Sequence, residues 1–140
     1  MGHINYASVL KGGIAAGVIM NISEFTLNLV NALGQMDAAS VTHSLPRPAG
    51  GQIVVLAGMT FMLGIMTVWL YAAIRPRLGA GPGTAICAGL VVWTLSYLYM
   101  TITLGVLGVS SMGIVVFSVV WTAAEMILAS AVGGYLYTEA

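Results

Sequence analysis

Four long apolar segments fill most of this chain, and they restrict its fold more than any short motif does. They cover about residues 7–33, 52–74, 85–106 and 112–137. Each reaches the roughly 20 residues that an α-helix needs to cross the hydrocarbon core of a bilayer. Only 6% of the residues are charged, which is too few to cover the surface of a soluble domain. The sequence therefore predicts an all-α polytopic integral membrane protein, a four-transmembrane-helix bundle forming a single transmembrane domain over residues 1–140.

The breaks between these segments predict two helical hairpins. The only long connection is 34–50, where Pro46 and Pro48 interrupt any helix. A glycine-rich turn at 79–83 precedes the third segment, and Thr84 is expected to cap that helix. Residues 14–18 resemble residues 86–90, which favours a weak internal repeat of the two hairpins.

Glu125 lies near the middle of the fourth segment, where a charge costs several kcal/mol and normally faces a bundle interior. Small and polar residues recur around it at helical spacing, which places them on one side of the helix. They are Ser118, Thr122, Glu125, Ala129 and Gly133. The first segment carries a similar strip of Gly13, Gly17, Asn21, Glu24, Asn28 and Asn31.

Glu24 and Glu125 are predicted to lie at a similar depth in the membrane. A rise of 1.5 Å per residue, counted from Val9 and from Tyr137, places Glu24 about 22 Å and Glu125 about 18 Å inside. No basic side chain within the segments reaches this depth, so we expect at least one carboxyl to be protonated at neutral pH. A structural role, in which the carboxyls bond neighbouring helices, has the same weight here as a functional one. The predicted polar or proton site comprises Glu24, Glu125, Asn21, Asn28, Thr60, Ser96, Tyr97 and Thr122.

Glycines are predicted where helices pack, because they let two backbones approach closely. These positions are Gly13, Gly17, Gly58, Gly64 and Gly133. They leave more helix surface open than one small bundle is expected to use. We therefore expect self-association or a complex with other membrane subunits, in addition to contact with the lipid bilayer, and a bound lipid or pigment is left open as a partner.

The end of the second segment has the residues of a membrane edge. Trp69 and Tyr71 are expected at the headgroups, followed by Arg75 and Arg77. With four spans, Lys11 lies on the same side as this arginine pair, so both termini are predicted to be cytoplasmic.

Several functional classes are set aside. Four basic side chains balance four acidic ones, so no basic surface is available for nucleic acid. Met59, Met62 and Met66 share a helix face that would suit Cu(I), but packing is the preferred interpretation. We expect no metal site and no cofactor.

The run at 73–85, together with residues 121–125 and the glycine-rich first segment with Glu24, resembles an uncharacterised group of small four-helix bacterial membrane proteins. The resemblance covers most of the chain. It implies four spans and a bacterial cytoplasmic (inner) membrane, and it implies no activity and no catalytic residues.

Three functions are weighed from the residues. The preferred one is an accessory or scaffolding subunit of a larger membrane assembly or homo-oligomer. The alternative is a proton- or cation-coupled small-solute transporter that uses Glu24 and Glu125. A lipid- or quinone-modifying enzyme ranks last, because no nucleophile–base pair or cofactor motif is visible. We therefore expect the chain not to be an enzyme.

The orientation is testable by cysteine labelling of intact cells. We expect a membrane-impermeant reagent to label His43→Cys and to leave Leu78→Cys unlabelled, because the two positions flank the second segment. The opposite labelling pattern would reverse the orientation.

Overall fold

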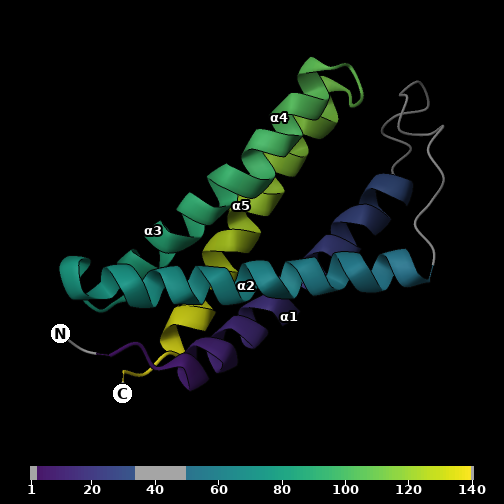
Figure 1. The fold of residues 1–140 in the computed structure, drawn as a ribbon. Helices are drawn as coiled ribbons and strands as arrows, with labels where there is room; N and C mark the ends of the chain where they lie inside the picture. The colour runs from purple at the N-terminus through teal and green to yellow at the C-terminus, as the bar shows by residue number, and fades with distance from the viewer. Residues whose placement is uncertain (1–2, 34–49, 140) are drawn as a thin grey trace.

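The computed structural model describes residues 3–33 and 50–139, and it confirms the predicted all-α four-helix fold (Figure 1). In chain order the helices are α1 (Tyr6–Leu33), α2 (Gly51–Leu78), α3 (Pro82–Trp93), η2 (Thr94–Leu98), α4 (Tyr99–Val106) and α5 (Met112–Tyr135). The elements α3, η2 and α4 follow one another without a break and make one span. Four helices are long and apolar enough to cross a membrane: Tyr6–Val30, Gly51–Leu78, Pro82–Val106 and Met112–Tyr135. Each satisfies its backbone hydrogen bonds internally, as a bilayer requires.

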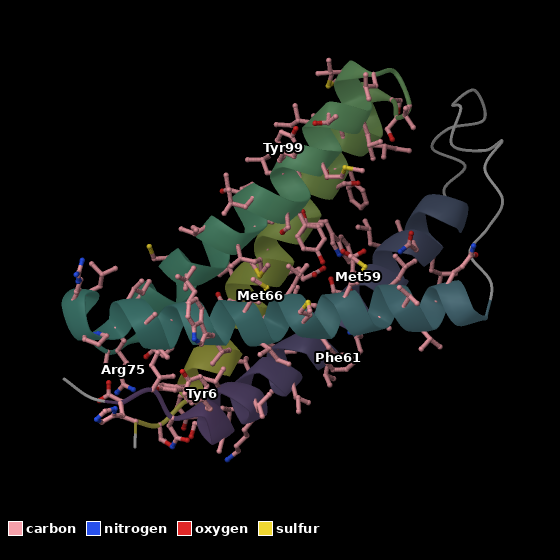
Figure 2. All side chains as sticks on the ribbon, in the orientation of Figure 1. Tyr6, Met59, Phe61, Met66, Arg75 and Tyr99 are labelled. Carbon is pink, nitrogen blue, oxygen red and sulfur yellow. The ribbon has the colours of Figure 1, made fainter. Side chains whose placement is uncertain are left out.

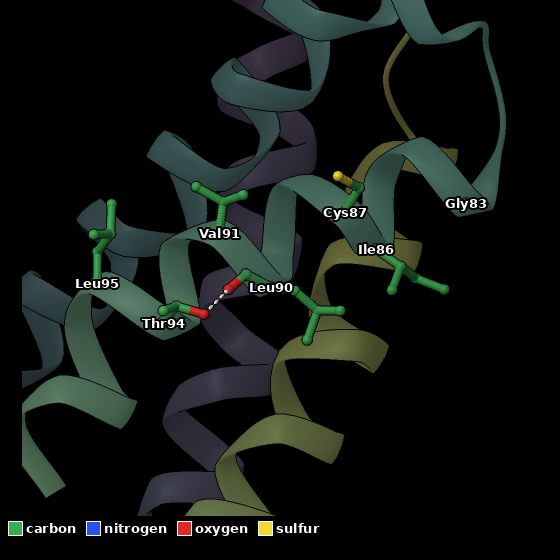
Figure 3. A pocket seen from close by; sticks show the side chains of 7 residues that line it. All are labelled: Gly83, Ile86, Cys87, Leu90, Val91, Thr94 and Leu95. Carbon is green, nitrogen blue, oxygen red and sulfur yellow. Dashed lines mark hydrogen bonds between the residues drawn. The ribbon is translucent and has the colours of Figure 1, made fainter. Parts of the chain in front are cut away.

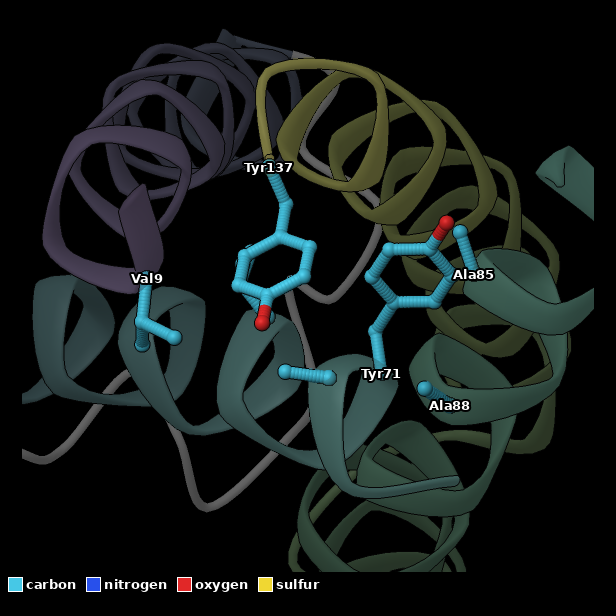
Figure 4. Close-up of a cluster of buried hydrophobic side chains, with 7 residues drawn as sticks. Val9, Tyr71, Ala85, Ala88 and Tyr137 are labelled. Carbon is cyan, nitrogen blue, oxygen red and sulfur yellow. The ribbon is translucent and has the colours of Figure 1, made fainter. Parts of the chain in front are cut away.

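The helices form a four-cornered bundle at the end where both termini lie. Figure 4 looks along this end, with α1, α2, α3 and α5 arranged around the centre. Each neighbouring pair is in contact, namely α1 with α2, α2 with α3, α3 with α5 and α5 with α1. The chain is thus two antiparallel hairpins, α1–α2 and α3–α5, packed side by side.

The bundle interior contains two apolar clusters. The first, close to the termini, holds Val9, Val68, Tyr71, Ala72, Ala85, Ala88 and Tyr137 (Figure 4). The second, nearer mid-span, holds Ala16, Met20, Met126 and Ala129. Both join residues from the two hairpins, so they hold the hairpins together over this half of the bundle.

The two hairpins separate toward the other end of the molecule. Figure 1 shows α4 and the start of α5 leading away from α1 and α2. Within the described chain, α4 contacts only η2 and α5. Residues 51–56 of α2 are exposed on every side of the helix. Among the described residues, helix contacts are therefore concentrated at the terminal end and fewer at the opposite end.

The third span contains a π-helical turn that the sequence did not signal. Thr94–Leu98 interrupts the α-helix between α3 and α4. Hydroxyls of Thr94 and Ser96 donate to the carbonyls of Leu90 and Val92, at 2.8 and 2.7 Å. Such turns are rare and frequently mark functional positions in helices.

One predicted helix cap needs correction. The second helix extends past the predicted span of about 52–74, since α2 continues to Leu78 through Pro76. The N-cap of α3 is Gly81, followed by Pro82 in the first turn. Thr84, expected to cap this helix, instead donates its hydroxyl to the Gly79 carbonyl at 2.8 Å and so fixes the preceding turn.

The predicted membrane edge is divided between an outer and an inner face. Trp69 is 44% exposed, whereas Tyr71 is only 4% exposed. Tyr71 faces the bundle interior, where its ring packs edge-on against Tyr137, with ring centroids 5.9 Å apart. Arg77 is exposed.

Arg75 closes this end of the bundle from the inside (Figure 2). Its guanidinium carbon lies 5.9 Å from the Tyr71 ring centroid and 5.5 Å from that of Tyr137, within cation–π range. Its Nε atom lies 4.0 Å from a carboxylate oxygen of Glu139. The arginine thus ties α2 to the C-terminal residues.

Glycine allows α1 and α2 to cross at very short range. A Cβ atom on Gly64 would lie 2.6 Å from the Gly13 carbonyl oxygen and 2.7 Å from the Gly17 nitrogen. Gly133 similarly faces Val68, where a Cβ atom would lie 2.6 Å from a methyl carbon. Gly58 differs, because a Cβ atom there meets no atom within 4 Å. Gly58 is therefore at no helix contact within the described chain.

Gly64→Ala is expected to destabilise the fold by about 1–3 kcal/mol, because the backbones of α1 and α2 must move apart. Gly58→Ala is the matched control on the same helix, and it should be neutral or stabilising by up to about 1 kcal/mol. Unfolding of both purified variants in mixed detergent micelles measures the difference. Equal stabilities would contradict the crossing.

Candidate functional site

Three ionisable side chains from three helices meet in the bundle interior. Glu24 comes from α1, Tyr97 from the π-helical turn and Glu125 from α5. The Tyr97 hydroxyl interacts with the Glu24 carboxyl, and the Glu125 carboxyl is close enough to act electrostatically on both. We call these three residues the carboxyl layer. It lies beside the mid-span apolar cluster, against which Tyr97 packs.

Glu125 is buried without a hydrogen-bond partner. The residue is 5% exposed, and among the described residues no donor bonds either carboxyl oxygen. The Ser23 hydroxyl lies next to this carboxyl without completing a hydrogen bond to it. Burying a polar group unpaired costs roughly 1–3 kcal/mol, and more when the group is charged. The Glu125 carboxyl therefore lowers the stability of the fold instead of adding to it.

Two tryptophans fix the helices immediately around Glu125. The Trp121 indole donates to the Ser23 hydroxyl at 2.9 Å and joins α5 to α1. The Trp93 indole donates to the Thr122 hydroxyl at 3.0 Å and joins α3 to α5. Since Trp121 and Thr122 lie one helical turn before Glu125, both bonds hold the carboxyl in a defined place.

A hollow of about 390 Å³ adjoins Glu125 between α5 and α1. It is lined by Ser23, Phe117, Val120, Trp121, Ala124, Glu125 and Leu128. Val120 and Leu128 are 65% and 56% exposed, so the hollow opens on the outer, apolar surface of the bundle. The Phe117 and Trp121 rings, with centroids 5.7 Å apart, form part of its wall. It is an open hollow on the surface and not an enclosed cavity.

The other residues predicted for the polar site donate hydrogen bonds to backbone carbonyls. Asn21 donates to the Gly17 carbonyl at 2.8 Å and to the Ala57 carbonyl of α2 at 3.4 Å. Asn28 is exposed and donates to the backbone carbonyl of Glu24. Thr60 and Ser96 each donate to a carbonyl of the preceding turn of their own helix. Of the residues predicted for the polar site, the structure brings together Glu24, Tyr97 and Glu125, with Thr122 one turn away.

Sequence reasoning missed Ser23 because it lies outside the strip that contains Glu24. A signal for it was present in the tryptophans. Trp93 and Trp121 fall well inside their segments, and a buried indole N–H normally finds an acceptor. A hydrogen-bond acceptor near each of the two indoles was therefore to be expected.

A second hollow, of about 500 Å³, follows the outer face of α3 (Figure 3). Its walls are Gly83, Ile86, Cys87, Leu90, Val91, Thr94 and Leu95, all from one span. The Thr94 hydroxyl is already bonded to the Leu90 carbonyl. No ionisable group other than the Cys87 thiol lines this hollow, so it offers an apolar surface and little chemistry.

Within the described residues, no group of three or more His, Cys, Asp or Glu side chains is placed to hold a metal ion. Arg75 lies with Tyr137 and Glu139 at the terminal end, away from the carboxyl layer. The described interior thus holds two acidic groups at mid-span. Comparison with models of known protein families, with curated proteins and with solved structures gave no match for this chain.

Replacing the unpartnered carboxyl by an apolar side chain is expected to stabilise the fold. Glu125→Met keeps an unbranched chain and removes a buried unsatisfied group, so the free energy of unfolding should rise by about 1–3 kcal/mol. Glu139→Gln, which removes a partly exposed ion pair, should change it by less than about 1 kcal/mol. Detergent unfolding monitored by circular dichroism measures both. A clear loss of stability in Glu125→Met would mean that Glu125 has a structural partner.

Proposed function

We propose that this membrane protein is a proton- or cation-coupled transporter of a small solute, in which the carboxyl layer is the coupling site. The observation that carries the proposal is the burial of both Glu125 oxygens without a hydrogen-bond donor from the described residues. A structural role for this glutamate would need a hydrogen bond to a neighbouring helix. An unsatisfied carboxyl that is retained despite its cost is better explained by something that it binds.

Glu24 and Tyr97 suit the same role. The Tyr97 hydroxyl can stabilise whichever charge state Glu24 adopts, because a phenol both donates and accepts a hydrogen bond. Two carboxyls that interact give up their protons as a coupled pair rather than independently. A cation that reaches Glu125 can thus displace a proton from the pair without creating an isolated charge in the membrane.

The two hairpins provide a mechanism for alternating access. Contacts of Gly133 and the Tyr71–Tyr137 pair close the terminal end, while at the opposite end of the described chain α4 contacts only η2 and α5. Rocking of α1–α2 against α3–α5 would open the terminal end and close the other. The third span carries Tyr97 on its π-helical turn, Thr94–Leu98, and such turns occur frequently at functional sites.

A second function, an accessory subunit of a membrane assembly or homo-oligomer, is favoured by a different observation. Large apolar side chains are exposed at the start of α2 and along α4, namely Ile53, Val54, Val55 and Leu56, and Tyr99, Met100, Ile102 and Val106. Val54 and Val106 are 72% and 79% exposed. Four spans are too few to surround a transport pathway well. A homodimer that covers these exposed faces would be compatible with both functions.

The proposal includes the location and orientation. The protein would lie in a bacterial cytoplasmic membrane with both termini in the cytoplasm, as Lys11, Arg75 and Arg77 favour. It assigns no catalytic step to the chain.

Proton exchange at Glu125 is expected to be visible in infrared spectra of the protein in bilayers. A shift from mildly acidic to mildly alkaline buffer should remove a protonated-carboxyl band in the native protein, because the coupled pair releases a proton. Glu125→Gln should lose this change, and Glu139→Gln should keep it. A native protein whose interior carboxyls show no change over this range would rule out the proton-coupled form of the proposal.

A further inference from the structure

We infer that the hollow beside Glu125 binds an organic monocation with an apolar or aromatic body, which enters sideways from the bilayer between α1 and α5. This inference rests on the proposed function for its site, and it adds the chemical class of the ligand. It follows from the charge at the site, the walls of the hollow and the position of its opening.

The charge at the site selects for a cation. Glu125 contributes to the lining of the hollow, while its two carboxyl oxygens are buried behind this lining and have no bonded donor among the described residues. The ionisable groups that face it are Glu24 from α1 and Tyr97 from η2, while the described part of α2 contributes none at this level. An anion would add a like charge to this layer, and a neutral ligand without a hydrogen-bond donor would leave the carboxyl unpaired. A monocation supplies the missing partner.

The walls select for an apolar body. Phe117, Val120, Trp121, Ala124 and Leu128 supply almost all of the lining. The two aromatic rings lie 5.7 Å apart by their centroids and are tilted by 48° to each other. Aromatic faces attract cations, most strongly where water is excluded. An inorganic ion would leave these walls without contacts, whereas an aromatic or alkylated ammonium would cover them.

The opening selects for a ligand that is soluble in lipid. Val120 and Leu128 at the rim belong to the exposed face of α5, which is the face a bilayer would surround. A ligand coming from water at the terminal end would have to pass Tyr71, Tyr137 and Arg75, which pack together there. On the lateral route the barrier is the Trp121–Ser23 hydrogen bond of 2.9 Å, which crosses from α5 to α1 beside the carboxyl. Exchange of this bond would let Glu125 turn toward the ligand.

The test uses the full chain in lipid nanodiscs, with benzyltrimethylammonium as the probe. Its neutral isostere neopentylbenzene has a carbon in place of the nitrogen, so the pair separates charge from shape. Equilibrium dialysis against empty nanodiscs corrects for partition into lipid. We expect saturable binding of the ammonium probe, at least about tenfold tighter than that of the isostere, because an ion pair forms in a medium of low dielectric constant.

Substitutions at Glu125 and Glu139 test whether binding depends on the Glu125 carboxyl or on the fold as a whole. Glu125→Gln should abolish the preference for the charged probe, and Glu125→Asp, which keeps a carboxyl, should retain part of it. Glu139→Gln, which removes a carboxyl at the terminal end, should bind as the native protein does. Equal binding of the two probes by the native protein, or an unchanged preference in Glu125→Gln, would overturn the inference.

The acidity of the buffer distinguishes this inference from the proposed function. If the probe and a proton share the site, binding should weaken by about tenfold per unit of falling pH on the acidic side. Binding that requires Glu125 but does not depend on pH would support the cation site and count against proton coupling. A carboxyl band that titrates in infrared spectra, without any preference for the charged probe, would support proton exchange and overturn the ligand class.

Discussion

The rest of the structure is arranged around a carboxyl group that lies at mid-span without a hydrogen-bond donor among the described residues. Glu125 lowers the stability of the fold wherever it remains unpaired. The surrounding residues pair with one another instead, since Trp121 bonds Ser23 and Trp93 bonds Thr122. These bonds leave Glu125 in a fixed position with unused bonding capacity. A buried carboxyl in this condition is suited to accept a proton or a cation from outside the chain.

Close helix contact at one end of the bundle makes this arrangement possible. The Gly64 crossing brings α1 and α2 together, and the ring contact between Tyr71 and Tyr137 closes the terminal end. Lipid gives little hydrophobic drive for helix association, so such short-range contacts supply much of the cohesion. Toward the other end of the described chain, α4 contacts only η2 and α5.

The spans and the meeting of Glu24 with Glu125 were within reach of sequence reasoning, because segment length and helical spacing depend only on local geometry. The rotation of each helix about its axis and the contacts between helices could not be predicted from the sequence in this way. Depth alone put Tyr71 beside Trp69 at the membrane edge, yet the two side chains point to opposite faces of α2. Gly58 resembles Gly64 in sequence, and only the crossing point of the helices distinguishes them. The π-helical turn and the role of Ser23 depend on partners from distant parts of the chain.

Solid-state nuclear magnetic resonance of the protein in bilayers, with ¹³C-labelled glutamate, tests the central claim most directly. Glu24, Glu125 and Glu139 are the only glutamates in the chain, so their carboxyl signals can be assigned by single substitutions. The account predicts a through-space correlation between the carboxyl carbons of Glu24 and Glu125, and a protonated carboxyl in one of them at neutral pH. Two ionised interior glutamates without such a correlation would contradict it.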